Sequence, residues 1–95
     1  MTNRDKDKCE MIADRFGYDS QASILQEECA ELIQALSKHR RYNDVGTLEC
    51  ISEEMADVYI MLEQIKHLLN NENRVKWYID YKLKRTIGRM EADLD

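Results

Sequence analysis

The sequence contains no proline and only three glycines, Gly17, Gly46 and Gly88, so few positions interrupt a helix. No segment alternates apolar and polar residues as a half-buried β-strand does. Long hydrophobic runs are also absent, since the longest, residues 58–62, is far shorter than the roughly 20 residues that a membrane span needs. These absences predict an all-α protein and argue against a transmembrane one.

Basic residues are in the minority, with 14 Lys and Arg against 19 Asp and Glu and a net charge of -5, which argues against a protein that binds duplex nucleic acid. The first residues lack the apolar core of a signal peptide, so we expect a cytoplasmic protein. The three cysteines, Cys9, Cys29 and Cys50, form no Cys-x-x-Cys pair. We expect them to be reduced and packed among apolar side chains.

A chain of 95 residues fits one domain, which we place at residues 1–95. Breaks near residues 17–20, 42–46 and 70–73 separate four helical segments, for which Asp19 or Ser20 and then Thr47 are suitable N-caps. The pattern predicts an antiparallel bundle of about four helices. The expected helices span residues 5–16, 20–41, 47–69 and 74–92.

The second and third expected helices each carry an apolar stripe with spacings of three and four residues, which predicts two core faces. The stripe residues are Leu25, Cys29, Leu32 and Leu36 on the first, and Ile51, Met55, Val58, Leu62, Ile65 and Leu69 on the second. So small a chain buries only about 60% of its unfolded surface. Further apolar residues, such as Trp77 and Tyr81, therefore indicate self-association, as a homodimer or homotetramer.

An internal repeat places acidic residues beside both stripes. Residues 24–32 align with residues 50–58, acid for acid and apolar for apolar. At about 100° per residue, Glu28 and Glu54 lie about 60° from a residue of their own stripe and point partly toward the core. Glu31 and Asp57 follow one turn later, so each helix offers two carboxylates side by side.

Packing of the two stripes against each other would gather these four carboxylates, and so many charges in a low dielectric need a positive partner. Lys and Arg side chains are one candidate, and metal ions that take oxygen ligands are the other. Mg²⁺ held by carboxylates keeps positions for substrate phosphates. The repeat therefore predicts a cation site that can recruit a polyphosphate.

The acidic motifs resemble a known family. The segment Glu27-Glu28-Cys29-Ala30-Glu31, followed by Glu54-Met55-Ala56-Asp57, is similar to the E-E-x-x-E and E-x-x-D pair of the MazG-like, all-α nucleoside triphosphate pyrophosphohydrolases. A weaker element of the same family, Lys-Leu-x-Arg, matches residues 82–85. The resemblance implies a hydrolase that cleaves a nucleoside triphosphate between the α and β phosphates, with Mg²⁺ as cofactor and Mn²⁺ as its substitute.

The resemblance also implies roles for individual residues. The metal ligands would be Glu28, Glu31, Glu54 and Asp57. Glu27 lies one turn before Glu31, where it either orients or deprotonates the attacking water, or is simply a solvated acid.

Phosphate oxygens need positive partners as well. The segment 74–91 has six bases and two acids, whereas residues 27–63 have nine acids and three bases. Lys82, Arg85 and Arg89 share one face of the last expected helix, where they either bind phosphate or pair with acidic residues. Lys38 is a further phosphate-binding candidate.

Two other interpretations compete with the hydrolase. A carboxylate-bridged di-iron bundle needs Glu-x-x-His on two helices, but His67 is preceded at this spacing by Gln64 and His39 by Leu36. A non-catalytic helical interaction module explains the apolar stripes equally well, although it does not explain two acid pairs beside them. We therefore keep the module as the alternative to the hydrolase.

Overall fold

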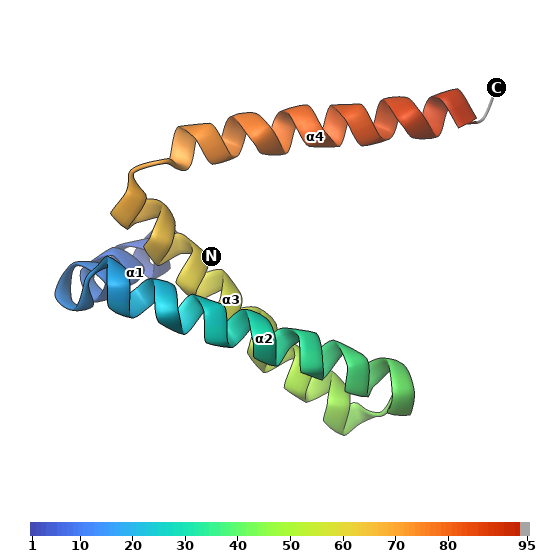
Figure 1. The fold of residues 1–95 in the computed structure, drawn as a ribbon, viewed down its shortest axis with the longest axis horizontal. Helices are drawn as coiled ribbons and strands as arrows, with labels where there is room; N and C mark the ends of the chain where they lie inside the picture. Colours follow the sequence, from blue (N-terminus) through green and yellow to red (C-terminus); the bar gives the residue numbers. More distant parts are fainter. Residues whose placement is uncertain (94–95) are drawn as a thin grey trace.

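The computed structural model describes residues 1–93 of the chain and consists of α-helices joined by short links (Figure 1). No strand occurs within this range, so the all-α prediction and the predicted number of helices are confirmed. None of these helices is both long enough and apolar enough to cross a membrane. The helices are α1 (Asn3–Phe16), α2 (Tyr18–Tyr42), α3 (Val45–Leu69) and α4 (Glu72–Asp93).

The helix starts differ from the predicted ones. Gly17 alone separates α1 from α2, because its φ of 85° lets the chain change direction within one residue, and the expected caps Asp19 and Ser20 lie inside α2. The cap of α3 is Asp44 rather than Thr47. The backbone N–H of Thr47 donates to the Asp44 carboxylate at 2.7 Å, and the Thr47 hydroxyl accepts from the Asp44 N–H, which forms a capping box.

Helices α2 and α3 pack antiparallel along their length, and α1 packs mainly on α3 (Figure 1). The buried apolar residues are Cys9, Ala13, Ala35, Ile51 and Met61. Two buried glutamines join them: Gln21 Nε2 donates to Gln64 Oε1 at 2.7 Å, which links α2 directly to α3. At the far end of α3, His67 Nε2 lies 2.8 Å from a carboxylate oxygen of Asp14 on α1.

The contact between α2 and α3 is displaced to one side of the predicted stripes. On α2, Gln21 and Ala35 are buried and Glu28, midway between them at seven-residue spacing, is half-buried. The prediction that both stripes are core faces is therefore only partly correct, because other stripe residues stay in solvent. Leu36, Met55 and Leu62 are each about 45% exposed, and Cys29 is exposed as well.

The cysteine prediction is likewise correct for only part of the set. All three cysteines are free, as expected, but Cys9 alone is buried, while Cys29 and Cys50 are exposed.

Periodicity identifies an apolar arc on a helix, yet it does not say which edge of that arc a neighbouring helix covers. The acidic edge of α2 is the one that faces α3.

Helix α4 runs away from the other three helices as a separate rod (Figure 1). It has no buried residue within its range, and it belongs to none of the closely packed helix pairs of residues 1–93. The link to α3 consists of Asn70, which adopts a left-handed conformation with φ 51°, and Asn71. The apolar and basic side chains of α4 are consequently presented to solvent.

Candidate metal centre

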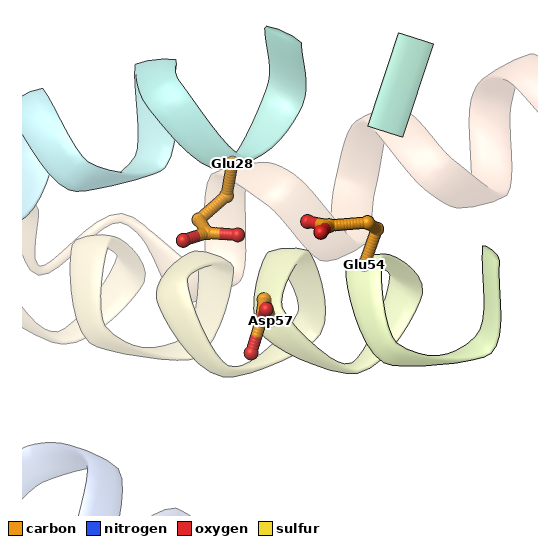
Figure 2. A group of neighbouring side chains, drawn as sticks. All are labelled: Glu28, Glu54 and Asp57. Atoms are coloured by element: carbon orange, nitrogen blue, oxygen red, sulfur yellow. The ribbon is translucent and has the colours of Figure 1, made fainter. Parts of the chain in front are cut away.

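Three of the four predicted metal ligands come together at the contact between α2 and α3. Glu28 extends from α2 toward α3 and Glu54 extends from α3 toward Glu28, while Asp57 lies one turn further along α3 (Figure 2). One carboxylate oxygen from each of them lies within 4.8 Å of the others. The structure therefore gathers carboxylates from both halves of the internal repeat into one group, which we call the acidic group.

Local structure explains how the acidic group forms. Glu54 and Asp57 are three residues apart, so helical geometry places them side by side on α3. Glu28 reaches them because α2 turns its Gln21–Ala35 face toward α3. The hydrogen bond between Gln21 and Gln64 lies two helical turns, or about 10 Å, from Glu28, and it holds the two helices in this register.

Burial and crowding change the acidity of this group. The pKa of Glu28 rises from 4.5 to about 7, first because the carboxyl is withdrawn from water and then because of Glu54, Asp57 and Glu31 nearby. Burial and the neighbouring acids Glu31 and Asp57 also raise the pKa of Glu54, although its interaction with the Glu28 carboxyl opposes this rise. Glu28 therefore keeps its proton to a higher pH than an ordinary glutamate does.

The acidic group lacks positive partners among the residues that the structure describes. Glu28 Oε2 and Glu54 Oε2 are buried atoms without a hydrogen-bond partner. No Lys or Arg within residues 1–93 forms an ion pair with these two residues or with Asp57. Buried carboxylate oxygens without a partner are costly, which favours a ligand that supplies positive charge.

The donor set of the acidic group fits a hard divalent cation. All three donors are carboxylate oxygens, the ligand type that Mg²⁺ prefers. Opposite ligands of Mg²⁺ lie about 4.2 Å apart, since each bond is about 2.1 Å long. Only one pair of the three oxygens can be opposite and adjacent ligands lie about 3 Å apart, so oxygens that lie within 4.8 Å of one another would move closer together to hold such an ion.

The other predicted acids lie on the exposed side of α2. Glu31 is exposed and stands outside the closest three carboxylates, but it is near enough to contribute to the raised pKa values of Glu28 and Glu54. Glu27 is also exposed, next to Glu28 in the sequence. The structure thus places Glu31 at the rim of the acidic group, while Glu27 lies outside the closest three.

The predicted phosphate-binding residues do not meet the acidic group within one chain. Lys38 is exposed on α2, ten residues and about 15 Å along the helix from Glu28. Lys82, Arg85 and Arg89 are exposed on α4, which packs on neither α2 nor α3. The Arg85 guanidinium instead lies 5.7 Å from the centre of the Tyr81 ring on its own helix.

Sequence reasoning missed the buried glutamines that support this site. Gln21 precedes Glu28 by seven residues, and Gln64 follows Asp57 by seven. A spacing of seven residues puts each glutamine on the face of its helix that carries the acid. This heptad spacing was the sequence signal that could have identified the two glutamines. The hydrogen bond between Gln21 and Gln64 joins the faces of α2 and α3 that carry the acids.

The comparisons with known proteins add no relative. No protein-family model matches the sequence, and neither a curated protein nor a solved structure matches it.

Proposed function

We propose that this chain is a Mg²⁺-dependent nucleoside triphosphate pyrophosphohydrolase of the MazG-like type. The reaction would cleave the bond between the α and β phosphates and release a nucleoside monophosphate and pyrophosphate. The observation that carries the proposal is the acidic group: three carboxylates from two helices, with buried oxygens that lack a partner. A surface with ordinary solvated acids would not leave such oxygens unpaired.

The acidic residues would bind the cation and the attacking water. Glu28, Glu54 and Asp57 would hold the cation, and Glu31 at the rim would complete the set. Bound Mg²⁺, or Mn²⁺ in its place, supplies charge neutralisation for phosphate oxygens and lowers the pKa of a coordinated water. Glu27 would hold the attacking water by accepting a hydrogen bond from it.

Basic residues would position the triphosphate. Lys82, Arg85 and Arg89 lie on a helix that does not reach the acidic group of its own chain, so their role fits best in a homodimer or homotetramer. We therefore propose that the hydrolase works as a homo-oligomer. Lys38 would contribute a positive charge from α2. We also propose that the enzyme is cytoplasmic.

The test is a panel of nucleoside triphosphates incubated with Mg²⁺, with pyrophosphate and monophosphate measured separately. The parent should release both in equal amounts, and Glu54→Gln should lose roughly 100-fold or more of the turnover because a metal ion contributes several kcal/mol to such reactions. Glu53→Gln is the matched control, since Glu53 is exposed and outside the acidic group. Equal activity of the parent and Glu54→Gln would refute the ligand assignment.

A non-catalytic helical interaction module remains the second candidate. The exposed apolar residues on α3 and α4, including Tyr59 and Trp77 at 61% exposure, favour a protein that binds other helices. The same panel separates the two functions. If no triphosphate yields pyrophosphate with either Mg²⁺ or Mn²⁺, the module is the better description.

A further inference from the structure

Helix α4 carries an apolar stripe that is largely uncovered within residues 1–93. Its members fall within an arc of about 120°, as in a helix that packs against a partner. Leu83 is 59% exposed, and its neighbours on the stripe are similar except for half-buried Val75. The stripe consists of Val75, Ile79, Leu83, Ile87 and Met90.

A groove of matching character lies between α1 and α3. It has a volume of about 720 Å³ and is lined mainly by apolar side chains, among them Cys9, Ile12, Ala56, Tyr59 and Ile60. Tyr59 also lines a second hollow, together with Leu32, Met55, Val58 and Leu62. We call these two neighbouring hollows together the docking groove. Met55 and Leu62 belong to the predicted core stripe that the chain itself leaves exposed.

The exposed area is far larger than a compact monomer would have. The structure exposes 7834 Å², whereas a compact protein of this mass exposes about 5700 Å². The excess of roughly 2100 Å² exceeds the roughly 800 Å² that each partner buries in a standard interface. One copy therefore has enough unburied surface for a stable contact with another.

The charges of the two surfaces are complementary. Residues 74–91, most of α4, have six bases and two acids, whereas residues 27–63 have nine acids and three bases. Ala56 and Val58 of the docking groove flank Asp57 in the sequence but lie about 100° from it around α3, so the groove and the acidic group are on different faces of this helix and the attraction acts through the net charges of the two segments. An approaching α4 is thus attracted by charge as well as by apolar contact.

We propose that α4 of one copy docks through its apolar stripe into the docking groove of a second copy, and that the second copy returns the same contact. This inference rests on the proposed self-association and is independent of the proposed hydrolysis. The exchange completes a helical bundle from two chains and buries the stripes that one chain leaves open. The other occupant to be tested is the chain's own α4, folded back at Asn70 and Asn71.

The first experiment uses the parent protein. Unlabelled and ¹⁵N-labelled chains are refolded together, their mass is measured by sedimentation, and they are cross-linked with a lysine-reactive reagent. Lys8 lines the docking groove, and α4 carries Lys76, Lys82 and Lys84. We expect a mass of at least twice 11.3 kDa and cross-links between Lys8 and α4 lysines that join one labelled and one unlabelled chain.

Two results of this experiment would overturn the proposal, and they differ in meaning. A mass of 11.3 kDa would refute self-association altogether. A second possible result is an oligomer in which no cross-link between Lys8 and α4 joins a labelled chain to an unlabelled one. This result would refute the exchange of α4 but not self-association. Neither result depends on a nucleotide, so the hydrolase proposal is tested separately.

Variants then test the direction of the contact. Leu83→Asp on the stripe and Tyr59→Asp in the docking groove should each be monomeric, and Lys84→Gln, which changes the net charge equally, should stay oligomeric. A mixture of the first two should regain a dimer, because one of the two reciprocal contacts then has both surfaces intact. If Tyr59→Asp alone remains a dimer, α4 binds elsewhere and the proposal is wrong. Circular dichroism checks that each variant stays helical.

Discussion

The buried glutamine pair offers a sharp test of how the site is held. Gln21 and Gln64 are 3% and 2% exposed, and the bond from Gln21 Nε2 to Gln64 Oε1 is 2.7 Å long. Replacement of Gln21 by Leu removes the donor and leaves the Gln64 oxygen buried without a partner. A buried polar group in this situation costs about 1–3 kcal/mol.

This cost is large for a small helical domain. A loss of 1 kcal/mol lowers the melting temperature by about 4–8 °C at this chain length, so Gln21→Leu should melt roughly 4–24 °C below the parent. The variant Gln21→Leu/Gln64→Leu removes both partners and should recover most of this loss, since a matched apolar pair leaves nothing unsatisfied. Urea denaturation followed by circular dichroism, at one protein concentration, gives the free energy of unfolding for each variant.

The four proteins form a double-mutant cycle, with Gln64→Leu as the other single change. We expect a coupling energy of about 1 kcal/mol or more between the two positions. If Gln21→Leu is as stable as the parent, or if the two single losses simply add, the pair does not hold α2 against α3. In that case the register of the acidic group depends on other contacts.

Three further predictions concern the site and its surroundings. In metal-free buffer the free energy of unfolding should fall as the pH rises from about 4.5 to about 7, because folded Glu28 keeps its proton while unfolded Glu28 loses it. Glu28→Gln should weaken this pH dependence. If the variant shows the same pH dependence as the parent, Glu28 is not its source. Arg85→Ala should raise KM about tenfold but leave stabilisation by Mg²⁺ unchanged, whereas a loss of that stabilisation would argue against a phosphate-binding role. Cys9, which is buried and has a raised pKa, should react with a thiol reagent more slowly than Cys29, and equal rates would place it at the surface.

The helices themselves could be predicted from the sequence because their signals are local. The absence of proline leaves long uninterrupted segments, and Gly17, Asn43 and Asn70 adopt the positive φ values that end them. The pairing of Glu54 with Asp57 also follows from helix geometry alone. Errors at the helix starts, such as Thr47 in place of Asp44, amount to a few residues, since several polar side chains compete to cap each helix.

The assembly of the site depended on contacts between distant residues. Which acids meet is set by the rotation and register of α2 against α3, and these are held by contacts such as Gln21 with Gln64, 43 residues apart. The result joins Glu28 to Glu54 and Asp57, leaves Glu31 at the rim and exposes residues expected in the core.

The path of α4 was equally beyond local sequence signals. Its direction depends on the backbone at Asn70 and Asn71, not on any periodicity within the helix. The sequence by itself therefore determined the helices and the acids that each one carries. Only the tertiary structure decided which faces meet, because packing energy depends on the relative placement of whole helices, whereas helix formation depends on neighbours a few residues apart.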